Sequence, residues 1–143
     1  MPNPEPVRPL AAYPSRTSAD IRYSDLDRQG HVNNAVFATF SEIGRVAFLY
    51  DPERPLAPAG ATFVIARLEI DFRAELHWPG RVEIGTAVAE IGNSSFRLVQ
   101  SLFSAGQPVA SAAAVLVMMD GATRRAMVLP PQSRAILETL RLR

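Results

Sequence analysis

The residues best suited to chemistry lie together in one polar segment, residues 25–34, with the sequence DLDRQGHVNN. The segment directly precedes a stretch with helical periodicity, so it should lead into a helix. The first N–H groups of a helix have no acceptor within it, and with the helix dipole they favour a carbonyl oxygen that gains negative charge. A carboxylate a few residues upstream can fold back to the same place. This combination is sufficient for acyl transfer, although the same residues also suit a helix cap and a turn.

The rest of the composition excludes many other kinds of active site. The 143 residues include no cysteine, no lysine and two histidines, His31 and His77. A thiol nucleophile, a Schiff base, a thiolate metal site and a three-histidine zinc site are therefore excluded. The net charge of +1 creates no whole-protein field that would steer nucleic acid or an anionic membrane. We expect no metal, no nucleic-acid partner and no membrane partner.

The length predicts a single domain. Five prolines among the first 14 residues, without an apolar run, predict an extended or disordered tail over residues 1–16 rather than a secretory signal. No stretch reaches the roughly 20 apolar residues that cross a bilayer. We therefore predict a cytoplasmic protein whose single domain covers residues 17–143.

The domain combines one long helix with a run of strands. Apolar residues spaced three or four apart predict a helix from Asn34 to Tyr50, with Asn33 or Asn34 as its N-cap. Alternating apolar residues predict strands, and the C-terminal residues predict a short helix. The extended segments cover residues 19–23, 62–72, 81–91, 96–103 and 109–119, and the short helix covers residues 131–142. Strands that follow a single helix indicate an α+β fold with an antiparallel sheet.

Several of these segments resemble the hotdog-fold acyl-CoA thioesterases, most closely the 4-hydroxybenzoyl-CoA thioesterase-like branch. The resemblance spans residues 19–121 and depends on a combination of motifs. They are residues 22–27 (RYSDLD), 30–34 (GHVNN), 66–72 (ARLEIDF) and 91–96 (IGNSSF), with Phe37, Phe40, Glu42 and Arg45 on the helix. The resemblance implies a long helix wrapped by an antiparallel sheet of about five strands. It also implies a homodimer or homotetramer whose sites lie between subunits.

The same resemblance assigns roles within the polar segment. It implies that Asp27 is the catalytic carboxylate and that the backbone N–H of Asn34, seven residues later, polarises a thioester carbonyl. Asp27 can act as a nucleophile or as a general base, and the sequence leaves both open. His31 can orient Asp27, contact substrate or make a structural hydrogen bond. Asn33 can cap the helix or contact substrate, and Asp25 occupies the less diagnostic position.

A second group of candidates concerns the phosphates of coenzyme A. Some relatives carry basic residues at the hairpin where this chain has Asn93, Ser94 and Ser95. Backbone N–H and hydroxyl groups of these three residues could contact the phosphates instead. Arg81 and Arg97 are further candidates, unless they are solvated surface charges.

The helix offers one more carboxylate, Glu42. Another hotdog branch uses a helix glutamate in catalysis, but here we expect Glu42 to form an i,i+3 pair with Arg45. Four aromatic side chains could line an acyl pocket or belong to the core. They are Phe37, Phe40, Phe63 and Phe72.

The predicted function is hydrolysis of an acyl-CoA thioester to a carboxylic acid and free coenzyme A, without a cofactor. An acyl carrier protein could instead deliver the acyl group, or the fold could bind acyl-CoA without turnover. A hydratase is a further alternative, but Asp27 and His31 lie four residues apart without an intervening proline, unlike the hydratases of this fold. The presence of Asp27 together with the helix-start loop favours an enzyme.

Overall fold

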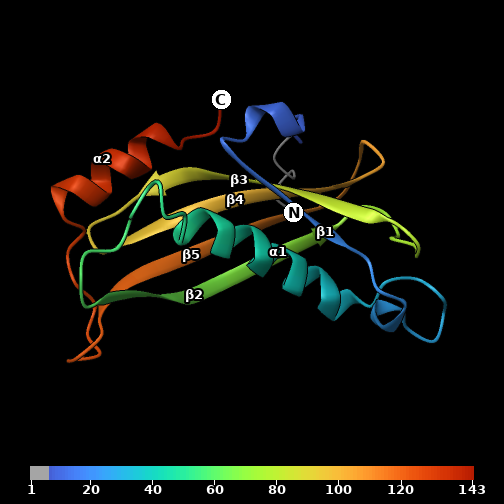
Figure 1. The fold of residues 1–143 in the computed structure, drawn as a ribbon, viewed down its shortest axis with the longest axis horizontal. Helices are drawn as coiled ribbons and strands as arrows, with labels where there is room; N and C mark the ends of the chain where they lie inside the picture. Colours follow the sequence, from blue (N-terminus) through green and yellow to red (C-terminus); the bar gives the residue numbers. More distant parts are fainter. Residues whose placement is uncertain (1–6) are drawn as a thin grey trace.

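The computed structural model describes residues 7–143, in which a long helix lies across one face of a five-stranded sheet (Figure 1). The strands are antiparallel in the order β1-β3-β4-β5-β2, so β1 and β2 form the edges. The helices and strands are η1 (Leu10–Ala12), β1 (Ser15–Asp20), η2 (Tyr23–Asp25), α1 (Asn34–Leu49), β2 (Ala61–Phe72), β3 (Arg81–Ile91), β4 (Ser95–Ser104), β5 (Gln107–Asp120) and α2 (Pro131–Thr139). The predicted α+β class is confirmed.

Helix α1 begins where the sequence predicts. Asn33 caps it, because its side-chain Oδ1 accepts a hydrogen bond from the N–H of Ala35 at 2.9 Å. The helix ends at Leu49, one residue earlier than predicted. On its sheet-facing side, a Cβ at Gly44 would lie 2.5 Å from Cγ2 of Ile84. Glycine therefore allows α1 to lie close to β3.

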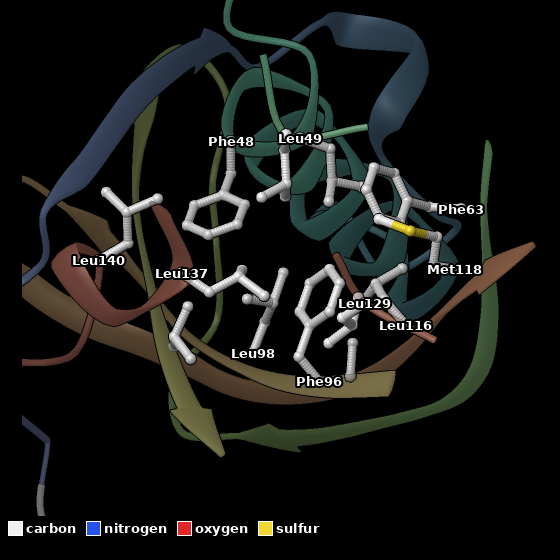
Figure 2. Packing of buried hydrophobic residues seen from close by; sticks show 13 residues of the cluster. Phe48, Leu49, Phe63, Phe96, Leu98, Leu116, Met118, Leu129, Leu137 and Leu140 are labelled. Carbon is white, nitrogen blue, oxygen red and sulfur yellow. The ribbon is translucent and has the colours of Figure 1, made fainter. Parts of the chain in front are cut away.

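Buried apolar side chains form a separate cluster under each half of α1. Near the helix start, Phe37 packs with the loop residues Val32 and Leu76 and with the sheet. Near the helix end, Phe48 packs with Phe96 of β4 and with α2 (Figure 2). Because α1 has 16 residues, about 24 Å separates its two ends.

The first strand starts earlier than the sequence predicted. Strand β1 occupies residues 15–20 rather than 19–23, and η2 replaces the end of the expected strand. The predicted tail boundary at residue 16 therefore falls inside β1. Tyr13 is buried, its hydroxyl lies 2.6 Å from Oγ of Ser101, and a Cβ at Gly85 would lie 2.5 Å from its ring. Residues 1–6 of the expected tail lie outside the described residues.

The edge strand β2 is exposed over much of its length although it carries large apolar side chains. Ile65, Leu68 and Phe72 are exposed on the strand, and Ile43 and Val46 are exposed on α1. We call these five residues the β2–α1 surface. Such an exposed apolar group is typical of an interaction surface. Among residues 7–143, no helix is both long and apolar enough to cross a membrane.

Candidate active site

The polar segment forms a tight loop that turns back on itself just before α1. Leu26 and Val32 form an antiparallel bridge, and the N–H of Asp27 donates to the carbonyl of His31 at 2.9 Å. The N–H of Gly30 in turn donates to the carbonyl of Asp27, with Gly30 at a φ of +87°. The loop thus places Asp27 beside the residues that lead into the helix.

The two aspartates of the loop have different surroundings. Asp25 is buried, and its carboxylate accepts hydrogen bonds from both the side chain and the backbone of Arg22 at 2.8 to 3.1 Å. Burial opposes its ionisation, but the bonds from Arg22 and the charge of that side chain outweigh it and hold the pKa of Asp25 below its ordinary value. Asp25 is therefore a structural carboxylate that fixes the start of the loop.

Asp27, in contrast, keeps part of its carboxylate free. Its side chain is 26% exposed, and its Oδ1 accepts one hydrogen bond, from the N–H of Gln29 at 2.8 Å. Its Oδ2 lies 3.6 Å from Nδ1 of His31. A carboxylate held on one oxygen and open on the other can attack a carbonyl carbon or remove a proton from water.

The start of α1 supplies the electropositive side of the site. Asn33 uses its side chain as the helix cap, which confirms the capping interpretation of this residue. The N–H of Asn34 has no acceptor within residues 7–143. As the first N–H of the helix, it can donate to an oxygen of a bound molecule.

A segment distant in sequence completes this end of the molecule. Nε2 of His31 lies 3.8 Å from Oε1 of Glu75, and the other oxygen of Glu75 lies 3.3 Å from Nε2 of His77. Sequence reasoning missed Glu75 and assigned nothing to His77, because no local motif links residues 73–80 to the loop. The available signal was only that the chain has two histidines. Within residues 7–143, no three His, Cys, Asp or Glu side chains converge as metal ligands would.

The hairpin between β3 and β4 lies at the opposite end of α1 (Figure 1). The carbonyl of Asn93 accepts from the N–H of Leu129, and the carbonyl of Ser94 accepts from the N–H of Met118, both at 2.9 Å. The predicted phosphate contacts of Asn93, Ser94 and Ser95 are therefore not brought to Asp27 within one chain.

The sequence also matches a known family. Residues 21–137 match the profile of the thioesterase-like superfamily. The chain belongs to this superfamily. No match is found among curated proteins.

Solved structures of the superfamily share the whole fold. A thioesterase from Thermus thermophilus, complexed with coenzyme A and zinc, is 31% identical with a TM-score of 0.79, over 90% of this chain and 95% of that one. The PA5185 protein from Pseudomonas aeruginosa is 27% identical with a TM-score of 0.83, over 96% and 98% of the two chains. The probable thioesterase YbaW from Escherichia coli is 27% identical with a TM-score of 0.77, over 88% and 98%. These similarities confirm the predicted hotdog thioesterase fold.

In this member of the superfamily, the predicted Glu42–Arg45 ion pair does not form. Glu42 is exposed whereas Arg45 is buried, and no contact joins their charged groups within residues 7–143. Burial lowers the pKa of Arg45, and the charge of Glu42 opposes this only in part. The pairing rule fails because it applies to two side chains on the solvent side of a helix, and Arg45 is not there.

The remaining candidates are structural or partly exposed. Arg81 lies 3.3 Å from Asp20 in an exposed ion pair, and Arg97 is half-buried on β4. Phe37, Phe40 and Phe63 belong to the core, whereas Phe72 is exposed and contacts Phe37 edge to face.

A cavity of about 410 Å³ lies between α1 and β2 of this superfamily member. It is lined by Ala38, Thr39, Glu42 and Arg45 of the helix and by residues 65–68 of the strand. Its volume lies in the range of small-molecule sites, and its shape is that of an open groove rather than an enclosed cavity. The cavity begins about one helical turn beyond Asn34, so it lies on the way from the helix start along α1.

Proposed function

We propose that this protein hydrolyses acyl-CoA thioesters, with Asp27 as the catalytic carboxylate and the N–H of Asn34 as the donor to the thioester oxygen. The observation that supports this most directly is the presence, near the start of α1, of two groups with open hydrogen-bonding capacity. One is the Oδ2 side of Asp27, and the other is the N–H of Asn34. Membership of the thioesterase-like superfamily favours thioester hydrolysis over other acyl transfers.

Two routes fit these groups. In the general-base route, Asp27 removes a proton from water while the water oxygen attacks the carbonyl carbon. In the nucleophile route, Asp27 attacks the carbonyl carbon itself, and water then hydrolyses the mixed anhydride. In both routes the C–S bond breaks, its electron pair leaves with the coenzyme A sulfur, and the oxyanion forms beside the N–H of Asn34.

We also propose that the active form contains at least two copies of the chain. The β2–α1 surface is apolar and exposed, and β2 is an unpaired edge. Antiparallel pairing of two β2 strands about a two-fold axis would place the hairpin end of one copy beside the catalytic loop of the other. Asn93, Ser94 and Ser95 of one copy could then contact coenzyme A bound to the other, and Asn33 could contact it from the loop.

The acyl group is proposed to lie in the cavity between α1 and β2, which the second copy would close. The Thermus relative binds coenzyme A, which supports a coenzyme A thioester as the substrate rather than a simple ester. The donor could still be an acyl carrier protein, because both donors carry the same thioester end.

The first experiment measures free thiol released from short, long and aromatic acyl-CoAs. The chain has no cysteine, so a thiol-reactive dye reports the product alone. We expect turnover in the wild type and a fall in kcat of about 10³-fold for Asp27→Asn. The melting temperature should hardly change, because asparagine can still accept from the N–H of Gln29.

The matched control is Asp20→Asn, which removes an exposed carboxylate of β1 whose one ion pair within residues 7–143 is with Arg81. It should keep the wild-type rate. An equal rate for Asp27→Asn and the wild type would exclude Asp27 as the catalytic group. If the wild type hydrolysed no acyl-CoA but did hydrolyse acyl carrier protein thioesters, the donor would be the carrier protein rather than coenzyme A. If neither kind of thioester were hydrolysed, the alternative that the fold binds acyl-CoA without turnover would remain.

The two routes differ in where an oxygen atom goes. In a single turnover in H₂¹⁸O, the nucleophile route places ¹⁸O in Asp27 when water attacks the aspartyl carbonyl of the mixed anhydride, whereas the general-base route never places it there. Mass spectrometry of the peptide that contains Asp27 reads this directly.

A further inference from the structure

The candidate site continues from Asp27 to the surface as a line of alternating carboxylates and imidazoles. The successive distances are 3.6 Å from Asp27 to His31, 3.8 Å from His31 to Glu75 and 3.3 Å from Glu75 to His77. Side-chain exposure is 26% for Asp27 and 23% for His31, and rises to 64% for Glu75 and 63% for His77. We call these four residues the acid–imidazole line.

Backbone hydrogen bonds hold the segment around Glu75 against the loop that carries Asp27 and His31. The N–H of Val32 donates to the carbonyl of Leu76 at 2.8 Å, and Leu76 is buried in the same apolar cluster as Val32. At the other end of the segment, the N–H of Ile21 donates to the carbonyl of Gly80 at 2.9 Å. The carboxylate of Glu75 therefore extends from a fixed backbone position next to His31, although the side chain itself reaches solvent.

Each ring nitrogen of His31 lies within 4 Å of a carboxylate oxygen, and the two carboxylates differ in the proposed reaction, because Asp27 must pass on a proton whereas Glu75 stays ionised. Glu75, when ionised, has only acceptor atoms, so its charge favours a hydrogen on Nε2 of His31 across the 3.8 Å that separate them, a distance slightly longer than a hydrogen bond. Nδ1 then remains towards Asp27, the group at which a water proton arrives in the general-base route. A carboxylate that orients an imidazole whose other nitrogen serves the reacting group is the arrangement that makes histidine an effective proton acceptor.

We propose that Glu75 is a positioning residue: it keeps the hydrogen of His31 on Nε2, so that Nδ1 receives the proton that Asp27 takes from water. This inference rests on the proposed thioesterase function and on its general-base route. His77 is the outer neighbour of Glu75 and helps to hold its carboxylate in place.

The protons balance over one turnover. Asp27 takes a proton from the attacking water, the C–S bond breaks, and the thiolate leaves with the electron pair. Asp27 then passes the proton to Nδ1 of His31 and recovers its negative charge, while His31 becomes an imidazolium between two carboxylates. The imidazolium releases the Nδ1 proton to solvent. One water is consumed, and one carboxylic acid, one thiolate and one proton are released; ionisation of the acid then releases a second proton to solvent.

The test that does not depend on turnover is the tautomer of His31, read from the ¹⁵N shifts of its ring nitrogens above the ordinary histidine pKa of about 6.5. The chain has only two histidines, so His77→Asn assigns the two rings. We expect wild-type His31 to carry its hydrogen on Nε2. Glu75→Ala should give a mixture of both tautomers, and Glu75→Gln, which keeps a neutral acceptor, should lie between the two.

The kinetic test asks whether Glu75 acts through His31. Glu75→Ala should lower kcat about 10-fold with KM unchanged, because it removes orientation rather than binding. In a His31→Gln background, Glu75→Ala should cause no further loss. The matched control is Glu83→Ala, which removes an exposed glutamate of β3 and should leave both the tautomer and kcat unchanged.

Three results would overturn the inference: an unchanged His31 tautomer in Glu75→Ala, losses that multiply in the double variant, or ¹⁸O recovered in Asp27. Failure of the proposed function gives a different pattern, in which the wild type releases no thiol while the tautomer still responds to Glu75→Ala. In that case Glu75 does control the tautomer of His31, but the protein does not hydrolyse these thioesters.

Discussion

The two ends of α1 carry polar groups of similar kinds but use them differently. At the hairpin end, the carbonyls of Gly92, Asn93 and Ser94 accept hydrogen bonds from Arg134, Leu129 and Met118, so the backbone carbonyls there are satisfied. That end is closed by α2 over a large apolar cluster.

At the loop end, hydrogen-bonding capacity is left over. The N–H of Asn34 has no acceptor within residues 7–143, and Oδ2 of Asp27 faces only a ring nitrogen at 3.6 Å. Asn34 is exposed and Asp27 is partly exposed, so both groups are open to water or to the proposed substrate. Within one copy, the hairpin carbonyls are therefore used by the fold, whereas groups at the loop end are open to the proposed substrate.

The largest expected effect comes from breaking the proposed interface between two copies, in which the hairpin end of one copy lies beside the loop end of the other. Leu68→Asp places a charge in the β2–α1 surface and should convert an oligomer into monomers, with loss of most turnover. Light scattering after gel filtration measures the mass. The control is Val128→Asp, an exposed apolar residue outside that surface. A wild type that is monomeric and fully active would refute the shared site.

The next effect should be confined to the hairpin end. Phe48→Ala removes a ring that is buried against Phe96 and α2 (Figure 2) and should destabilise the protein by about 3–5 kcal/mol. The fraction that remains folded should keep its kcat, because the loop end has its own cluster around Phe37. Urea unfolding and active-site titration separate the two quantities. A fall in kcat per folded molecule would mean that the ends are coupled through α1.

A smaller effect separates the two aspartates of the loop. Asp25→Asn replaces a buried carboxylate that accepts three hydrogen bonds from Arg22, and should cost about 2 kcal/mol at pH 7. Because the pKa of Asp25 is lower in the folded chain than in the unfolded chain, its stabilisation is complete above the unfolded value and is lost as the pH falls through the folded one. The difference between wild type and variant should therefore shrink in acid. Unfolding at pH 7 and pH 3 would reveal this, and a difference that grew in acid would contradict the assignment.

The sequence predicted the parts of this comparison that depend on local patterns. The helix, its Asn33 cap and the residues of the loop follow from periodicity and capping preference, which act between neighbours in the chain. The four long strands were also predicted within a few residues. The first strand was misplaced, because a short edge strand next to a 3-10 turn has little periodicity, and the burial of Tyr13 depends on the space that Gly85 leaves on another strand.

The site was predicted only as far as the loop itself. Glu75 and His77 reach it from the connection between β2 and β3, and only the folded sheet brings that connection to His31. The prediction of a Glu42–Arg45 ion pair was wrong for the opposite reason. The i,i+3 pairing rule considers only neighbours on one helix, whereas tertiary packing buries Arg45. Local rules therefore located the proposed catalytic carboxylate, and the groups that surround it required the three-dimensional structure.

The smallest expected effect tests the helix start directly. Asn33→Ala removes the side chain that accepts from the N–H of Ala35 and should cost about 1 kcal/mol. Glycine is a better N-cap residue than alanine, so Asn33→Gly should lower the free energy of unfolding by only a few tenths of a kcal/mol. If the helix start also serves the reaction, kcat should fall more in Asn33→Ala than the loss of stability alone would cause, because a frayed first turn misdirects the N–H of Asn34. Circular dichroism and thiol release on the same two variants measure both quantities. Equal kcat in the two variants would mean that the N–H of Asn34 is held in place without its cap.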